Sequence, residues 1–220
     1  MTHARKLTRR QAYARLTRDA VIESAHRLFV EQGYAATSIR AVAADASVSE
    51  QTVYRVFGDK AGLLRAVLLA AVGVEAGADA LREGPLVEQL AAAATPSERL
   101  RIVAQAARAA YERGLAPLEG IVFAAASADE RVAELARDIA EQRYQDTRSL
   151  VVAILGDAEL DGVRVDDVVD YVYAVESSPV YLALTAERGW ATQAYVDWFV
   201  EMFERMFLSR VIDRPAGRST

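Results

Sequence analysis

The chain contains no cysteine and only two histidines, His3 and His26. Without thiols it forms no disulfide and offers no thiolate for nucleophilic attack or zinc binding. Two histidines are too few for a histidine-built metal centre, so we expect neither a metal ion nor another cofactor. No apolar run approaches the roughly 20 residues that a membrane span needs, and no apolar segment follows the N-terminal charges as in a secretory signal. We therefore expect a soluble, cytoplasmic protein without a membrane partner.

Sequence motifs of common enzyme classes are also missing. The chain has no phosphate-binding glycine motif, no serine-elbow motif and no metalloprotease motif. An acidic stretch at 157–162 imitates the start of a calcium-binding loop, but its twelfth position is Val168 instead of glutamate. No nucleophile–base pair supports an enzyme, so an enzyme or a ligand carrier on a helical scaffold is only an alternative.

The 220 residues, 52% of them hydrophobic, supply ample core, and their charges are divided unevenly. Residues 1–60 carry ten Lys/Arg against six Asp/Glu, whereas the remaining 160 residues carry 16 against 25. The first eighteen residues hold six basic side chains and no acid: Arg5, Lys6, Arg9, Arg10, Arg15 and Arg18. A basic front on an acidic body indicates a polyanionic partner, the alternative being a solvated, disordered leader.

Helical periodicity recurs along the chain, and no period-2 run is long enough for a sheet, so we expect an all-α fold. The first helix should begin at Thr17 and end at Gly33, and the fourth should run from Asp59 to about Arg82. Thr95-Pro96-Ser97-Glu98 and Ser127 with Glu130 are capping boxes that predict two further helix starts. The expected helices lie at about 17–33, 37–46, 49–58, 59–82, 96 onward, 127–155, 166–187 and 192–211.

Two short helices near the N-terminus are separated by a turn of about three residues, which is the spacing of a helix-turn-helix. Apolar residues including Ile39, Val53, Val56 and Phe57 would form the inner face. The outer face of the second helix would carry Glu50, Gln51, Thr52, Tyr54 and Arg55. Gln and Arg read adenine and guanine in the major groove, and helix starts at Thr37 or Ser38, at Ser49 and at Asp59 offer N–H groups to phosphates. Any helical hairpin would have apolar residues inside and polar residues outside, so a hairpin that does not bind DNA remains an alternative.

The same segment resembles a known family. The pattern is Phe29…Gly33-Tyr34…Thr37-Ser38-Ile39-Arg40…Val42-Ala43…Val48-Ser49…Thr52-Val53-Tyr54…Phe57…Lys60…Leu63-Leu64. It is similar to the N-terminal domain of the TetR family of bacterial transcriptional regulators over about residues 17–66. The resemblance implies a DNA-binding head, a helical C-terminal domain that binds a small effector, and a homodimer built on the last two helices.

The resemblance also implies roles for single residues. Thr37, Tyr54 and Lys60 should touch phosphate, while Gln51, Thr52 and Arg55 face bases. Two departures from the pattern are Ser47, where the turn usually has Gly, and Gly62. A left-handed Ser47 would cost roughly 1 kcal/mol. The candidate DNA-binding residues are Thr37, Ser38, Arg40, Ser49, Glu50, Gln51, Thr52, Tyr54, Arg55 and Lys60.

A polar window interrupts the apolar face of the long helix after Ser127. Gln142, Arg143 and Asp146 follow an apolar run, and on the next helix Glu176 lies among apolar residues. Such a window is either a site that orients an apolar or aromatic ligand or a structural Arg143–Glu176 ion pair. The candidate effector-binding residues are Tyr111, Phe123, Gln142, Arg143, Asp146, Tyr173 and Glu176.

The last two expected helices carry two further signals. Pro179 should kink its helix or free carbonyls near Val175. An aromatic stripe on the terminal helix indicates an oligomer interface, unless it packs within one chain. The candidate dimer-interface residues are Tyr181, Leu184, Trp190, Tyr195, Trp198, Phe199, Met202, Phe203 and Met206.

Together these observations predict an all-α fold with an N-terminal helix-turn-helix domain and a larger C-terminal effector-binding and dimerisation domain. We expect a basic arm at 1–16, the DNA-binding domain at 17–66, the second domain at 67–211 and a tail at 212–220. The expected function is that of a homodimeric repressor that binds a palindromic double-stranded operator and is released by a small effector. A regulator without an effector is the main alternative.

Overall fold

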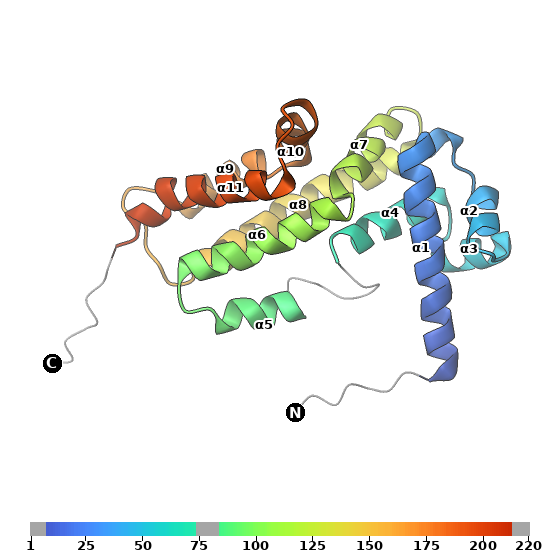
Figure 1. Ribbon diagram of the computed structural model, residues 1–220, viewed down its shortest axis with the longest axis horizontal. Coiled ribbons are helices and arrows are strands. Elements are labelled where there is room, and N and C mark those ends of the chain that lie inside the picture. The colour runs from blue at the N-terminus through green and yellow to red at the C-terminus, as the bar shows by residue number, and fades with distance from the viewer. Residues whose placement is uncertain (1–7, 74–83, 213–220) are drawn as a thin grey trace. The chain divides into compact units, whose positions relative to one another are not determined.

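The computed structural model describes residues 8–73 and 84–212, and every named element in these ranges is helical (Figure 1). The chain forms two compact units. The N-terminal unit comprises the chain up to Ala71 together with Pro117–Ala136, and the C-terminal unit comprises Val72–Ala116 and the chain from Arg137 onward. The predicted boundary after residue 66 therefore misses a distant segment that packs with the head. Within the described ranges, no helix is both long and apolar enough to cross a membrane.

Helix α1 (Arg9–Ala36) begins two turns before its predicted start at Thr17. Thr8 accepts a hydrogen bond from the Gln11 amide at 3.3 Å, and the Gln11 side chain accepts one from the Thr8 amide at 2.9 Å. This capping box satisfies two amides that a helix start would otherwise leave free. The predicted arm at 1–16 is thus helical from Arg9, while residues 1–7 lie outside the described residues. The expected break at Gly33 is confirmed by its φ of 78°.

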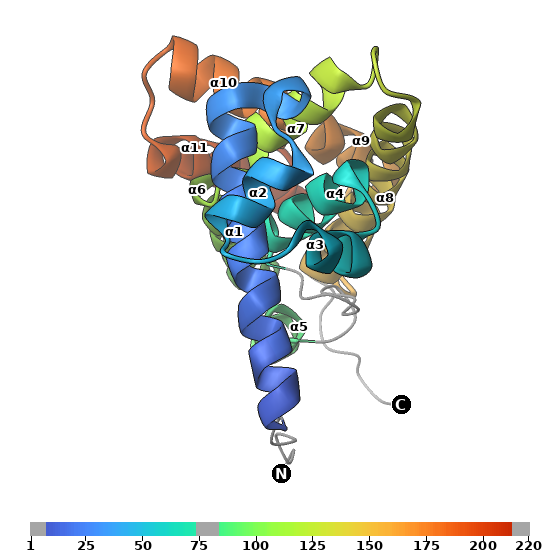
Figure 2. The ribbon, with the colours of Figure 1, turned by 90° about the vertical axis from the view of Figure 1, so that its right-hand side faces the viewer.

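Three short helices complete the head: α2 (Ile39–Asp45), α3 (Glu50–Phe57) and α4 (Lys60–Ala71). Figure 2 shows α2 and α3 beside α1 and α4. The predicted caps are confirmed, since Ser38, Ser49 and Asp59 each accept an amide three residues on, at 3.1, 3.2 and 2.8 Å. The core includes these residues, each at most 1% exposed: Val21, Ala25, Phe29, Val42, Val53, Leu63, Leu64 and Val67.

Three details of the head differ from or sharpen the sequence analysis. Ser47 has a φ of 55°, so it adopts the left-handed conformation for which the sequence analysis gave a cost. Val56, predicted to face inward, is 44% exposed because Val53 and Phe57 occupy the inner face of α3. Helix α4 ends at Ala71, eleven residues before its predicted end, and Gly73 follows with a left-handed φ of 81°.

The distant segment of the N-terminal unit is the corner between α7 (Leu115–Ala125) and α8 (Glu130–Leu155). Ser127 was the expected cap of α8, but its hydroxyl donates to the Ala124 carbonyl at 3.2 Å. Asp129 caps α8 instead, and its carboxylate accepts the amides of Arg131 at 3.0 Å and Val132 at 3.3 Å. An aspartate suits this position because its charge also complements the positive end of the helix dipole.

The C-terminal unit contains α5 (Pro85–Ala92), α6 (Pro96–Glu112), α9 (Val165–Val175), α10 (Ser178–Leu182), α11 (Thr192–Met206) and most of α8. A π-helical turn (Ala183–Glu187) follows α10, and a 3₁₀ turn (Leu208–Arg210) follows α11. The capping box of Thr95 and Glu98 is confirmed, with bonds of 3.2 Å in both directions. Helices α6 and α11 lie side by side, and α5 packs along α6 (Figure 1).

The aromatic stripe of α11 faces its own chain. Tyr195, Phe199 and Phe203 are 1%, 5% and 0% exposed, and Tyr181 on α10 is 9% exposed. Phe199 and Phe203 lie in a cluster of buried side chains: Leu100, Val151, Ile154, Leu155, Val168, Val169, Val172 and Phe207. The assignment of these four aromatic residues to a dimer interface is therefore wrong, because the unit needs them to fill its core. The remaining candidates, Leu184, Trp190, Trp198, Met202 and Met206, are half-buried or exposed.

The end of α8 depends on a contact with α6. The Arg99 guanidinium donates to the Ala153 carbonyl at 3.2 Å, and its Nε atom is buried without a hydrogen-bond partner. Gly156 has a left-handed φ of 58°, and a Cβ atom there would lie 2.2 Å from Arg99 Nη1. A side chain at this position would therefore be strained by the backbone conformation and would displace the Arg99 guanidinium.

We predict that Gly156→Ala destabilises the protein more than Gly162→Ala. Gly162 has a φ of 67° with nothing within 4 Å of its absent Cβ, so alanine there costs only the left-handed strain of about 1–2 kcal/mol. Gly156→Ala adds the loss of the charged Arg99 hydrogen bond, about 1–3 kcal/mol. Urea unfolding measures both costs, and in an Arg99→Ala background the difference between them should vanish. Equal costs in the wild-type background would contradict this account.

Candidate nucleic-acid interface and tyrosine cluster

The predicted recognition helix α3 presents a polar outer face. Glu50, Gln51 and Arg55 are exposed, and Tyr54 is 50% exposed. Thr52 is half-buried and its hydroxyl lies 2.9 Å from that of Ser49 at the helix cap. Gln51 and Arg55 are one helical turn apart, so their long side chains leave the same face. This arrangement can present two side chains that each form a pair of hydrogen bonds with a base edge in a major groove: Arg55 as a double donor, and Gln51 as one donor and one acceptor.

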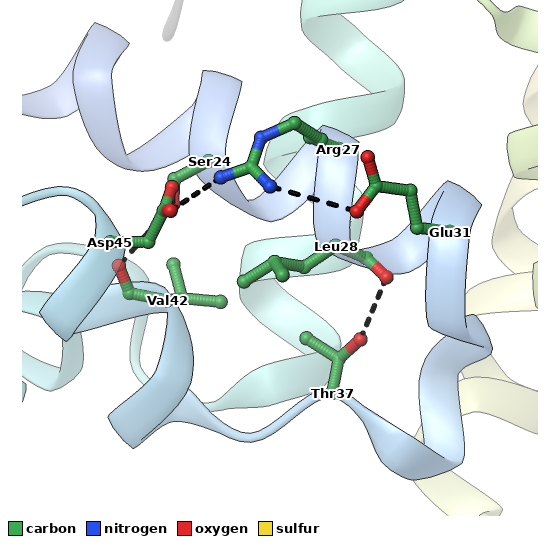
Figure 3. Close-up of polar contacts among 7 residues, drawn as sticks. All are labelled: Ser24, Arg27, Leu28, Glu31, Thr37, Val42 and Asp45. Atoms are coloured by element: carbon green, nitrogen blue, oxygen red, sulfur yellow. Dashed lines mark hydrogen bonds and ion pairs between the residues drawn. The ribbon is translucent and has the colours of Figure 1, made fainter.

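Helix α2 is locked onto α1 by polar contacts that the sequence analysis did not identify (Figure 3). The Ser24 hydroxyl donates to the Val42 carbonyl at 3.4 Å and also to the Asp45 carboxylate. The Arg27 guanidinium pairs with Asp45 and, at 3.6 Å, with Glu31. Hydrogen bonds from Ser24 and then Arg27 lower the pKa of Asp45. These contacts fix the end of α2 against α1 and thereby set the start of the turn that leads to α3.

Thr37 does not face the solvent, although the resemblance implied a phosphate contact. Thr37 is only 1% exposed, and its hydroxyl donates to the Leu28 carbonyl at 3.1 Å and to the Gly33 carbonyl at 2.8 Å (Figure 3). The Gly33 carbonyl needs this partner because the left-handed residue interrupts the helical ladder. Thr37 therefore closes the corner between α1 and α2, and the assignment of its side chain to phosphate is corrected.

Lys60 also has a structural task. Its ammonium group donates to the carbonyls of Tyr34 at 2.9 Å and Thr37 at 3.1 Å, and it lies 4.1 Å from the centre of the Tyr34 ring. Burial lowers the pKa of this lysine, while the charge of Asp129 raises it. The ammonium group therefore does not contact phosphate directly, although the resemblance implied such a contact. Instead it holds the turn between α1 and α2 by binding carbonyls at both ends of it.

Other candidates stay available on the surface of the head. Arg40 on α2 is exposed, and so are the cap residues Ser38 and Ser49. Arg18 on α1 lies 5.8 Å from the centre of the Phe57 ring at the end of α3. Arg40, the half-buried Arg18 and the two capped helix starts form a surface suited to a chain of phosphates.

The C-terminal unit contains a cluster of three tyrosines around a carboxylate. Tyr111 and Tyr181 stack with ring centres 4.0 Å apart, and Tyr195 meets both rings edge-on at 5.7 and 5.3 Å. The Tyr111 hydroxyl donates to the Glu176 carboxylate at 2.7 Å. Burial and then the negative charge of Glu176 raise the pKa of Tyr111 well above its usual value. Tyr181 and Tyr195 were expected at a dimer interface, so sequence reasoning missed this cluster.

The predicted opening of the helix near Pro179 is confirmed between α9 and α10, and it leaves carbonyl groups to be satisfied. The Arg143 guanidinium donates to the Tyr173 carbonyl and, at 3.2 Å, to the Glu176 carbonyl. The Ser177 hydroxyl donates to the Ala174 carbonyl at 2.9 Å, and the Tyr195 hydroxyl donates to the Val175 carbonyl at 3.2 Å. Arg143 also lies 4.0 Å from the centre of the Tyr173 ring. Arg143 thus caps the end of α9, a role that neither sequence reading foresaw.

The remaining effector candidates are not gathered around this cluster. Gln142 is exposed and donates to Asp146 at 2.7 Å along α8. Phe123 is 56% exposed and belongs to the N-terminal unit, whereas the other six candidates belong to the C-terminal unit. A hollow of about 450 Å³ between α5 and α6 is lined by other residues: Leu86, Gln89, Arg101, Ile102, Gln105 and Ala106. The residues of the predicted polar window are therefore separated: Gln142 and Asp146 bond to each other on the outside of α8, whereas Arg143 caps the end of α9.

The geometry of the head defines a helix-turn-helix domain, a class of fold whose second short helix enters the major groove of DNA. Residues 21–67 match the family described as bacterial regulatory proteins, tetR family. The chain is 41% identical over 54 residues to YvkB, an uncharacterized HTH-type transcriptional regulator of Bacillus subtilis strain 168, a match to 24% of this chain and 29% of that protein. Over this segment the chain is similar to the tetR family of regulators.

Solved structures resemble both units. One is NalD, the secondary repressor of the MexAB-OprM multidrug efflux pump in Pseudomonas aeruginosa, with 18% identity, a TM-score of 0.63 and coverage of 90% of this chain and 98% of that one. A second is a transcriptional regulator from Saccharomonospora viridis in complex with choline, with 17% identity, a TM-score of 0.60 and the same coverage. At these identities the likeness establishes the fold.

Several residues of the head escaped sequence reasoning because their roles depend on distant partners. Ser24, Arg27 and Asp45 read as ordinary solvent-facing residues of two helices. Tyr34 and Asp129 are 95 residues apart in the sequence, yet the Tyr34 hydroxyl donates to Asp129 at 3.1 Å. The only local signal was Asp129 itself, an acid at a helix start, where the capping box at Ser127 gave a competing prediction.

We predict that acid weakens the head through Asp45. The folded-state pKa of Asp45 lies below its ordinary value, so its contribution to stability is complete above that ordinary value and is lost as the pH falls through the folded-state pKa. The melting temperature should therefore fall as the pH drops below about 4. Asp45→Asn should lower the melting temperature at pH 7 and make its fall with acid shallower, whereas Asp157→Asn, an equal change of charge elsewhere, should not. Identical acid profiles for Asp45→Asn and the wild type would contradict the assignment.

Proposed function

We propose that this protein is a DNA-binding transcriptional repressor. The observation that carries the proposal is that Gln51 and Arg55 are both exposed on the short helix α3. Ser24, Arg27, Thr37 and Lys60 use their polar atoms within the head, which leaves the outer face of α3 free for a partner. A relative of the same fold, NalD, is described as a repressor, and YvkB as a transcriptional regulator. A protein that binds a bacterial chromosome acts in the cytoplasm.

The operator would be a near-palindrome bound by a homodimer. A twofold dimer presents two α3 helices to successive major-groove faces, so the half-sites repeat the symmetry of the protein. We place the dimer interface on residues that stay partly exposed: Leu184, Trp190, Trp198, Met202 and Met206. Trp190 and Met206 are 37% and 38% exposed, and the two tryptophan rings meet edge-on at 6.1 Å. Tryptophan and methionine are enriched at the centres of protein interfaces.

The first turns of α1 would add a non-specific contact with DNA. Arg9 and Arg10 are exposed on a helix that extends beyond α2 and α3, where Tyr13 and Leu16 are 74% and 68% exposed (Figures 1 and 2). Cations on such an extension attract phosphates whatever the base sequence. Arg9 and Arg10 would thus lie along the backbone of the operator.

A small effector would release the repressor by binding the C-terminal unit. Glu176 and the three tyrosines offer apolar rings with polar handles, which suit a mainly apolar or aromatic ligand with one or two polar groups. The relative in complex with choline supports a small organic effector. The effector must favour one conformation of the protein over the other, because equal affinity for both would shift nothing.

A repressor without an effector is the second candidate, and one observation favours it. Tyr111, Arg143 and Tyr195 already use their polar atoms on Glu176 and on the carbonyls at the end of α9. A cluster satisfied by itself needs no ligand. The Glu176→Gln experiment below separates the two candidates.

We predict that Arg55→Ala and Gln51→Ala relax base preference at one position in each half-site. Each should lower operator affinity by about 1–3 kcal/mol, because a bidentate base contact is lost. Arg40→Ala should weaken all DNA sequences alike and reduce the slope of log affinity against log salt by about one. Selection of bound fragments from a random pool measures the preference. Equal loss of base preference in Arg40→Ala and Arg55→Ala would contradict the assignment of α3.

We predict that Glu176→Gln separates an effector site from a structural cluster. The change is nearly isosteric and keeps an acceptor for Tyr111, so in an effector site it should leave the melting temperature and DNA affinity almost unchanged. A panel of apolar and aromatic compounds that raises the melting temperature of the wild type should then lose its effect on the variant. Tyr144→Phe, which alters a tyrosine outside the cluster, is the control. A strongly destabilised variant whose folded fraction still responds to the compounds would rule out the effector role of Glu176.

A further inference from the structure

We propose that Asp129 and Arg131, in the first turn of α8, are positioning residues of the DNA interface. They lie outside the matched segment 21–67, yet they contact the two points of the head that hold α2 and α4. This inference rests on the proposed DNA binding and adds a fifth element, the α7–α8 corner, to the four helices of the head. The contacts that carry it are one ion pair and one hydrogen bond, both within the N-terminal unit.

The ion pair joins Arg131 to Asp59. One oxygen of the Asp59 carboxylate accepts the Gly62 amide at 2.8 Å and so caps α4, while the other oxygen receives the Arg131 guanidinium. Bonds from Gly62 and then Arg131 keep the pKa of Asp59 low, so the carboxylate stays charged at neutral pH. Arg131 thereby holds the start of α4, the helix that directly follows α3.

The hydrogen bond joins Asp129 to Tyr34. Asp129 accepts the Tyr34 hydroxyl at 3.1 Å with one oxygen, while the other accepts the amides that begin α8. Tyr34 is only 8% exposed, and the Lys60 ammonium group lies over its ring in a cation–π contact. Lys60 in turn holds the carbonyls of Tyr34 and Thr37, just before the cap of α2 at Ser38. A displacement of α8 would therefore be transmitted to α2 as well as to α4.

The exposure of Arg131 makes this role testable apart from folding. Its side chain is 71% exposed and that of Asp59 is 37% exposed, so the pair contributes little to stability. A pair of this kind can orient two helices while its removal leaves the fold intact. Arg131 could instead touch phosphate itself, and the salt dependence of binding distinguishes the two roles.

The experiment uses full-length protein and the DNA fragment that the wild type recovers from a random pool. Arg131→Gln should lower affinity for this fragment about 3- to 10-fold, with a melting temperature close to that of the wild type and an unchanged salt slope. Arg131→Lys should retain most of the affinity. Arg137→Gln, an equal change of charge two turns further along α8, should behave as the wild type. Asp59→Asn keeps a helix cap, and in that background Arg131→Gln should cause no further loss.

Each contrary outcome overturns a named part of the proposal. Wild-type affinity in Arg131→Gln, or tighter binding, would show that the α7–α8 corner does not position the head for DNA. A salt slope reduced by about one would make Arg131 a phosphate contact. Independent losses from Asp59→Asn and Arg131→Gln would break the link between the two residues. A wild-type protein that enriches no DNA sequence would refute the proposed function, and the positioning role with it.

Discussion

Main-chain carbonyls at interrupted helices must find new partners, and this constraint governs both units of the molecule. In the head, the left-handed Gly33 ends the regular part of α1, and carbonyls at the corner that follows accept side-chain donors. Thr37 and Lys60 supply the donors, and Lys60 reaches the carbonyls on either side of the corner. The direction of α2, and through it the placement of α3, follows from how this corner is closed.

The same constraint appears where α9 gives way to α10. Four consecutive carbonyls, from Tyr173 to Glu176, accept side-chain donors from Arg143, Ser177 and Tyr195. These donors come from α8, from the break itself and from α11, so the interrupted helix ties three elements together. Burial of the tyrosine rings around Glu176 then makes the network costly to disturb, since any donor removed leaves a polar group unsatisfied in an apolar setting.

The all-α fold, the helix caps of the head and the opening near Pro179 could be predicted because each depends on neighbours within a few residues. Thr37 and Lys60 were assigned to phosphate by the resemblance, and Arg143 to a ligand or an ion pair because a polar residue in an apolar pattern suggests a site. Each of the three instead satisfies carbonyls at a helix end. Tyr195 and Phe203 gave a stripe that suits either a second chain or the chain's own core, and periodicity does not distinguish the two. The start of α1 at Thr8 was predictable, since Thr8 and Gln11 form a capping box of the same kind as those recognised at Thr95.

The outer face of α3 is the proposed DNA-binding surface, and the other polar residues of the head position this helix. The most direct test is an unbiased selection of genomic DNA fragments bound by the purified protein, followed by footprinting of the recovered fragments. The account predicts a near-palindromic site with two protected major-groove faces, lost from the selection by the combined change Gln51→Ala and Arg55→Ala. Recovery of fragments without a shared sequence, or the same site recovered by that variant, would contradict it.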